Sequence, residues 1–231
     1  MRNLEKDAAE MAERRDAILE AGFKLFSEKN IEPVSMNEVA KAAGVGIATL
    51  YRYYSTKPDL VIAVGTRVWD VYTREQYRKF EGIETEKTTA AEEFEFYLES
   101  FLDLYRNHRD ILRFNQFFNI YLQSEKKSRM QTAPYMEIVG VLEDRFNQMY
   151  QKALCDGTLR TDIPEKKIFY TTIHLMLAAV TRYAVGLVYT EETDPEEELQ
   201  LLKDLLLTKF SVHSGDSDGR EQGVLCHASE R

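Results

Sequence analysis

Two short helical segments joined by a glycine turn constrain this chain more than any other feature of its sequence. Ser35 and Glu38 have the spacing of a capping box, in which each side chain pairs with the other residue's backbone amide, so a helix is predicted to begin at Met36. Gly44 should end this helix, because glycine adopts a left-handed conformation at low cost, and Gly46 should open a second helix at once. Such a short connection predicts a tight helix-turn-helix.

The second helix of this pair has a packing side and a displayed side. At about 100° per residue, the packing side carries Ile47, Leu50 and Tyr54. Thr49, Arg52 and Tyr53 fall on the other side, where hydroxyls bond bases or phosphates and arginine bonds guanine in the major groove. Tyr51 and Lys57 are placed for phosphate contacts. Any one of these tyrosines, taken alone, is as consistent with core packing as with a DNA contact. The helix caps and the glycine turn favour the DNA-binding interpretation.

The segment from Arg14 to Lys57 resembles the DNA-binding domain of the tetracycline-repressor (TetR) family of bacterial one-component regulators. The matching runs are RRDAILEAGFKLFSEKN, VAKAAGV and ATLYRYYSTK. The resemblance implies DNA contacts by four positions, with a fifth as a backbone anchor: Thr49, Tyr51, Tyr53, Lys57 and Ser35. The candidate DNA-binding set is completed by the start of the second helix and its arginine: Gly46, Ile47, Ala48 and Arg52. We expect an all-α fold with an N-terminal three-helix helix-turn-helix domain followed by a helical ligand-binding and dimerisation domain.

The predicted domain boundaries follow from composition and helical spacing. Residues 1–60 should form the N-terminal arm and DNA-binding domain, residues 61–212 the helical domain, and residues 58–80 the connecting helix. Beyond residue 80 the apolar residues keep helical spacing and strand signals are absent. Further helices are expected after the polar segment 81–89 and at 109–123, 134–155, 164–189 and from 195 onward. Residues 125–133 are expected to form a mobile loop, and 213–231 a disordered tail.

Aromatic residues are dense in the second domain. They could line a cavity for a small hydrophobic or aromatic effector, with His174 as an orienting polar group; taken singly, each residue fits a helical core better. The resemblance implies an effector held between helices and therefore favours the cavity. The candidate effector-binding residues are Phe101, Tyr105, Phe114, Phe117, Phe118, Tyr121, Met149, Tyr170, His174 and Tyr183.

The last two helices are predicted to form a dimer interface. Residues 164–189 are apolar on nearly every side after a charged first turn, and such a helix must be buried, here in part by a partner subunit. Two such helices from each chain would make a four-helix interface, as the resemblance also implies. The candidate interface residues are Ala178, Ala179, Arg182, Leu199, Leu202 and Leu206.

Composition excludes several other classes of protein. Among 231 residues the net charge is −9, yet residues 14–67 hold eight Lys and Arg against six Asp and Glu, so the basic excess lies where phosphates would bind. The four histidines are scattered, the two cysteines lack metal-ligand spacing, and no phosphate loop or nucleophile elbow occurs. We expect no enzyme activity, cofactor or metal. Without a signal region or membrane span, the protein is expected in the cytoplasm.

These expectations combine into one functional hypothesis. The chain should be a homodimeric repressor that binds a palindromic operator in double-stranded DNA and is released by a small effector. The alternative is a DNA-bound adaptor or activator whose second domain binds a protein partner. An enclosed aromatic cavity would favour the first hypothesis, and an exposed aromatic patch the second.

Overall fold

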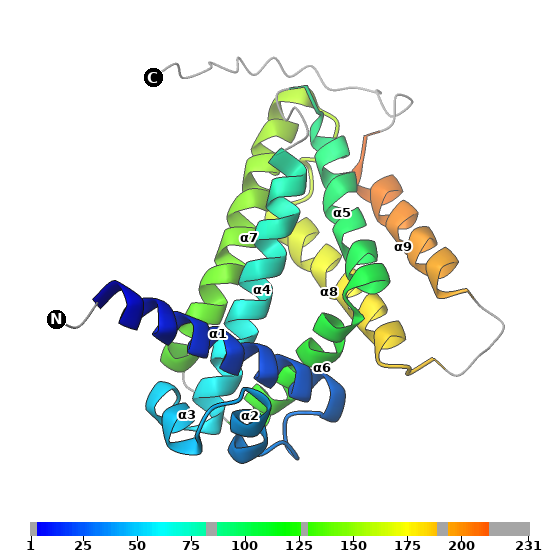
Figure 1. Cartoon of the computed structure of the whole chain (residues 1–231). Coiled ribbons are helices and arrows are strands. Elements are labelled where there is room, and N and C mark those ends of the chain that lie inside the picture. The colour runs from blue at the N-terminus through cyan, green and yellow to red at the C-terminus, as the bar shows by residue number, and fades with distance from the viewer. Residues whose placement is uncertain (1–3, 82–86, 126–128, 189–193, 213–231) are drawn as a thin grey trace. The chain divides into compact units, whose positions relative to one another are not determined.

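The computed structural model describes residues 4–81, 87–125, 129–188 and 194–212, and this part of the chain contains nine helices (Figure 1). Its one strand-like feature is an isolated antiparallel bridge between Leu159 and Ser211. The prediction of an all-α fold is confirmed. The helices are α1 (Leu4–Lys29), α2 (Met36–Ala42), α3 (Ile47–Tyr53), α4 (Lys57–Glu81), α5 (Ala90–Asn107), α6 (Arg109–Ser124), α7 (Arg129–Asp156), α8 (Glu165–Ala184) and α9 (Pro195–Phe210).

One predicted loop is wrong in part. Residues 129–133 are helical, because α7 begins at Arg129 and contains Pro134 in its second turn. A proline this close to a helix start removes one backbone hydrogen bond but fits the helical φ angle. Residues 126–128 and the predicted tail 213–231 lie outside the described residues. In the described chain, no helix combines the length and hydropathy needed to cross a bilayer.

The chain divides into two compact units whose limits cut through helices. The first unit comprises residues 1–77 and 104–140, and the second comprises residues 78–103 and 141–231. Helix α6 and the beginning of α7 therefore cluster with the helix-turn-helix rather than with α5, α8 and α9. The helices of the predicted second domain, residues 61–212, are therefore divided between the two units.

The core of the first unit joins α1, α3, α4 and α6. Phe26, Leu50, Leu60 and Phe118, one from each of these helices, have no exposed surface. Gly65 lets α4 approach α6 closely, since a β-carbon added there would lie 2.8 Å from the Phe118 ring. In Figure 1, α2 and α3 lie side by side next to α1. The buried faces of these helices position the helix-turn-helix.

The second unit is held by aromatic contacts and a buried lysine. The Phe94 ring of α5 meets Phe146 of α7 and Phe210 of α9 edge-on, with centroids 6.1 and 6.0 Å apart. Lys203 of α9 is 7% exposed. Its ammonium donates to the Glu99 carboxylate of α5 at 2.8 Å. Because an ammonium is buried only when it is paired, this contact fixes α9 against α5.

Gly65→Ala should lower the free energy of unfolding by about 1 to 3 kcal/mol, because the new methyl group meets the buried Phe118 ring. Gly140→Ala is the matched control on α7, where no atom lies within 4 Å of the added carbon. It should raise stability by about 0.5 to 1 kcal/mol, since alanine favours helix. Urea unfolding of both variants measures the difference. Equal stabilisation by both substitutions would contradict a tight contact between α4 and α6.

Candidate nucleic-acid interface

The first helix of the helix-turn-helix begins with the predicted capping box. The Ser35 hydroxyl oxygen accepts from the Glu38 amide at 3.2 Å, and the Ser35 amide donates to the Glu38 carboxylate at 2.8 Å. These hydrogen bonds from Ser35, helped by the charge of nearby Lys29, lower the pKa of the Glu38 carboxyl. The cap therefore holds the start of α2 most firmly while Glu38 is ionised.

The turn between α2 and α3 depends on a left-handed glycine. Gly44 has φ +66, and the Val45 amide donates to the Ala40 carbonyl oxygen at 3.0 Å. This pairing closes the end of α2 in the manner of a Schellman motif. Gly46 then caps α3 with extended backbone and no side-chain hydrogen bond. The amides at the start of α3 thus keep donors available for a phosphate.

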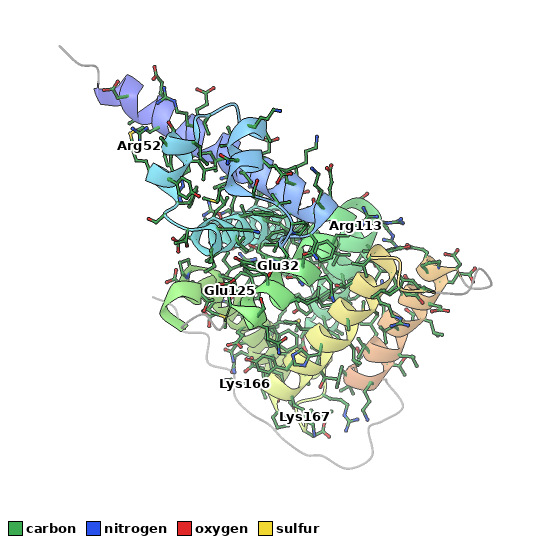
Figure 2. All side chains as sticks on the ribbon, turned by 90° about the horizontal axis from the view of Figure 1, so that it is seen from below. Glu32, Arg52, Arg113, Glu125, Lys166 and Lys167 are labelled. Carbon is green, nitrogen blue, oxygen red and sulfur yellow. The ribbon has the colours of Figure 1, made fainter. Side chains whose placement is uncertain are left out.

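More residues of helix α3 are exposed than the sequence predicted. Leu50 is fully buried and Tyr54 is 8% exposed, whereas Tyr51 is 49% exposed. Ile47, placed on the packing side from its helical angle, is exposed, because the first turn of α3 extends past the core. Arg52 lies on the outer surface of the first unit (Figure 2). The displayed residues are Gly46, Ile47, Ala48, Tyr51 and Arg52.

Two residues predicted as DNA contacts are partly engaged within the first unit. Thr49 and Tyr53 are half-buried, and Ser35 is exposed at the start of α2. The Tyr53 hydroxyl donates to the Met11 carbonyl oxygen at 3.2 Å, so it ties the end of α3 to the N-terminal part of α1. The sequence contains no signal for this contact, because it joins residues 42 positions apart.

Lys57 lies at the first residue of α4, and its side chain is half-buried. Its ammonium donates to the Glu32 carbonyl oxygen at 2.8 Å and lies 5.8 Å from the centroid of the Tyr121 ring. Burial lowers the pKa of Lys57, although the charges of Glu32 and Glu125 oppose this shift. Burial, together with the same two carboxylates, raises the pKa of Tyr121 to about 12. Two of the three ammonium hydrogens remain available for a phosphate.

The sequence analysis did not predict the N-terminal cap of α4. The Thr56 amide donates to the Asp59 carboxylate at 3.0 Å, and the Asp59 amide donates to the Thr56 hydroxyl oxygen at 3.3 Å. The S/T-x-x-D spacing is a sequence signal that could have identified this cap. It directs α4 immediately after the last turn of α3 and so places Lys57 beside the displayed surface.

The candidate effector residues are not brought together in one unit. Phe114, Phe118 and Tyr121 are buried in the core of the first unit, where Phe114 meets Phe23 of α1 edge-on with ring centroids 5.7 Å apart. These rings fill the space between α1, α4 and α6, and their role as effector-binding residues stays a prediction. Tyr105 and Phe117 also belong to the first unit, and the remaining candidates belong to the second: Phe101, Met149, Tyr170, His174 and Tyr183.

The second-unit candidates are spread over α5, α7 and α8. Tyr170 and Tyr183 donate their hydroxyls to Glu143 and Glu198. His174 is exposed, with its ring 5.9 Å from that of Tyr170. A surface depression in this unit contains none of the candidates. It is lined by Ala91, Glu92, Glu95, Asp204, Leu207, Thr208 and Ser211.

Two of the predicted dimer residues face the interior of their own chain. Leu199 is 1% exposed and Leu206 is 5% exposed, so neither side chain is available to a partner subunit. The prediction of these two contacts is wrong, because one apolar face of α9 packs within its own unit and the other is displayed. Leu201 and Leu205 are the exposed leucines, at 60% and 58%. Of the other candidates, Ala178 and Arg182 are exposed and Ala179 and Leu202 are half-buried.

The helix-turn-helix segment matches known regulators in sequence. Residues 18–64 match the family model described as bacterial regulatory proteins, tetR family. An HTH-type transcriptional regulator of Staphylococcus aureus strain USA300 is 42% identical over 69 residues, which are 30% of this chain and 36% of that protein. A regulator of S. aureus strain NCTC 8325 matches with the same values. The chain therefore spans about a third of the length of these curated relatives.

Solved structures share the fold over most of the chain. A putative transcriptional regulator from Saccharomonospora viridis in complex with choline has a TM-score of 0.70 at 16% identity, covering 87% of this chain and 100% of that one. The transcriptional regulator FadR from Bacillus subtilis in complex with stearoyl-CoA has a TM-score of 0.66 at 17% identity, covering 85% and 98%. Residues 18–64 therefore match the helix-turn-helix domain described as bacterial regulatory proteins, tetR family, and the described chain shares the helical fold of solved regulators.

Proposed function

We propose that the chain is a sequence-specific DNA-binding transcriptional regulator, which acts as a homodimeric repressor and leaves its operator when a small effector binds. One observation carries this proposal most directly. The outer surface of α3 displays Tyr51 and Arg52 next to glycine-opened amides, while Leu50 anchors the opposite side in the core. A short, rigidly anchored helix with hydroxyl and guanidinium groups outward suits the major groove.

Phosphate contacts would position this helix on the duplex. The basic excess of the DNA-binding segment is small, so amides and hydroxyls must supply part of the affinity alongside Lys57. Ser35, Thr49, Tyr51 and Tyr53 offer hydroxyls around the displayed surface. Arg52 is the side chain best suited to base recognition, because its fork matches the acceptors of guanine. Ile47 and Ala48 offer apolar contact to a thymine methyl group.

A second copy of the chain would complete the DNA-binding form. The exposed side of α8 and α9 carries Ala178, Arg182, Leu201 and Leu205. Exposed leucines one turn apart on a helix are costly to leave in water, and a two-fold partner would cover them with its own equivalent surface. Two reading helices related by this axis would meet successive major grooves of an inverted repeat.

The effector part of the proposal has support from relatives of the same fold. Two of those structures are described as complexes with choline and with stearoyl-CoA. By analogy, we propose that this chain also binds a small molecule in its helical part. To weaken operator binding about a hundredfold, the effector must prefer the non-binding conformation by roughly 2.7 kcal/mol.

Arg52→Ala should weaken binding to the operator by about 1 to 3 kcal/mol and relax specificity at one base pair in each half-site. The operator is first selected from a random double-stranded DNA library with the wild-type protein, and an inverted repeat is expected. Arg113→Ala, an exposed arginine on α6, is the control and should bind as wild type. Selection of no common motif at low salt would refute sequence-specific binding.

Lys57→Gln should weaken binding to specific and random DNA alike, because a phosphate contact carries no sequence information. The slope of log K against log salt concentration should become shallower by about one. The control is Lys166→Gln on α8, which changes the same charge at an exposed position. An unchanged salt slope would show that the Glu32 carbonyl retains Lys57 and that no phosphate contacts it.

Leu201→Glu combined with Leu205→Glu should convert the dimer into a monomer, because four carboxylates would be buried across the two-fold axis. The monomer should lose most of its operator affinity while keeping its helical circular dichroism. Leu154→Glu, at an exposed leucine on α7, is the control. Sedimentation equilibrium measures the association. A dimer of unchanged affinity in the double variant would place the interface elsewhere.

A further inference from the structure

Apart from the Tyr54 hydroxyl, two buried polar atoms in the first unit have no hydrogen-bond partner among the described residues. One is the indole nitrogen of Trp69 on α4, which is a donor, and the other is the side-chain oxygen of Asn115 on α6, which is an acceptor. Asn115 is only 3% exposed. Leaving such a group unpaired in an apolar interior costs about 1 to 3 kcal/mol. Each of these atoms therefore lacks a partner that the described residues could provide.

The two atoms lie in the same stretch of the interface between α4 and α6. At one end of this stretch, Gly65 of α4 touches the ring of Phe118 on α6. At the other end, the ring centroid of Tyr72 on α4 lies 5.3 Å from that of His108, the N-cap residue of α6. The two helices therefore run antiparallel. Trp69 falls between the two contact points on α4, and Asn115 falls between them on α6, so both belong to the same few helical turns.

Helix α7 adds a third polar group at this place. The Tyr135 ring meets the Phe118 ring edge-on, with centroids 5.0 Å apart. Burial raises the pKa of the Tyr135 hydroxyl. A donor on α4, an acceptor on α6 and a hydroxyl on α7 therefore lie on the three helices that meet at the Phe118 ring. The apolar side chains beside them are Phe114, Phe118 and Tyr72.

We propose that Trp69, Asn115 and Tyr135 form the polar end of an effector site that takes a small neutral molecule with an apolar body and a hydroxyl or amide group. The inference rests on the proposed function and specifies its ligand. A single hydroxyl accepts a hydrogen bond from the Trp69 indole and donates one to the Asn115 oxygen. An ether or a ketone accepts only and leaves Asn115 unpaired.

Charge at this site favours a neutral ligand. The Arg74 guanidinium of α4 pairs with Asp70, and Arg67 pairs with Asp16 of α1; all four side chains are at least 37% exposed. The Arg109 guanidinium of α6 lies over the Tyr105 ring, 4.3 Å from its centroid, and donates to the Tyr105 carbonyl oxygen. An ionic head group would lose its hydration here without gaining a free counter-charge from these residues.

The position of this site explains how ligand binding would change the position of α3. Phe118 belongs to the same core as Leu50 of α3 and Leu60 of α4. A molecule inserted beside Phe118 would change the spacing of α4 and α6, because the Phe118 ring lies directly against the α4 backbone at Gly65. Because packed cores transmit such shifts rather than absorb them, α3 would move with α4.

The first experiment uses the fluorescence of Trp69, which is the single tryptophan of the chain. The wild-type protein is titrated with alkan-1-ols from hexan-1-ol to dodecan-1-ol and with methyl ethers of equal heavy-atom number. The alcohols should shift Trp69 emission and bind about tenfold more tightly than the ethers, because one buried hydrogen bond separates the two series. The alcohols should also release operator DNA.

Asn115→Leu should abolish the preference for alcohols and retain operator binding. Because the substitution removes an unpaired acceptor, the Tm of the ligand-free protein should rise. Asn119→Leu makes the same change at an exposed position of α6 and should retain the preference. Equal binding of alcohols and ethers by the wild-type protein overturns the proposal, and so does an unchanged preference in Asn115→Leu. Alcohol preference without any DNA binding would instead refute the proposed function and leave this site standing.

Discussion

The close contact of α4 with α6 at Gly65 and Phe118 is the constraint on which the first unit depends. With no β-carbon at Gly65, the Phe118 ring can lie directly against the α4 backbone. Helix α6 then completes a core that also contains Phe26 of α1 and Leu50 of α3. The short helices α2 and α3 have few residues of their own to bury, so their stability comes from this shared core. The displayed surface of α3 is rigid because its opposite side is part of that core.

The displayed surface of α3 is held by local helix caps and by hydrogen bonds to distant residues. The Ser35–Glu38 and Thr56–Asp59 caps begin α2 and α4 at defined residues. The contacts of Tyr53 with Met11, and of Lys57 with Glu32, connect the ends of α3 and the start of α4 to distant parts of the chain. A helix held at both ends presents its side chains with little loss of entropy on binding, which suits a chain with a small basic excess.

Periodicity predicted most helices well but assigned several of their faces incorrectly. The aromatic residues of α6 have the spacing of a buried stripe, and the pattern is the same for a ligand cavity and for a core. In the structure, Phe114 and Phe118 pack on α1 and α4 in the core of the first unit. The leucines of α9 pose the same difficulty. Helix α9 has two apolar faces. Which of them packs inward depends on α5, because the glutamates of α5 pair with Lys203.

The sequence by itself determined the helical class, the Ser35–Glu38 capping box, the glycine turn and the helix-turn-helix, because each of these depends on residues within one or two helical turns. Only the tertiary structure decided that α6 joins the first unit and that Ile47 is displayed. It also decided that Leu201 and Leu205 face outward, and that Trp69 and Asn115 share one stretch of helix interface. These facts depend on contacts between residues far apart in the chain, and helical spacing carries no information about which distant helix covers a given face.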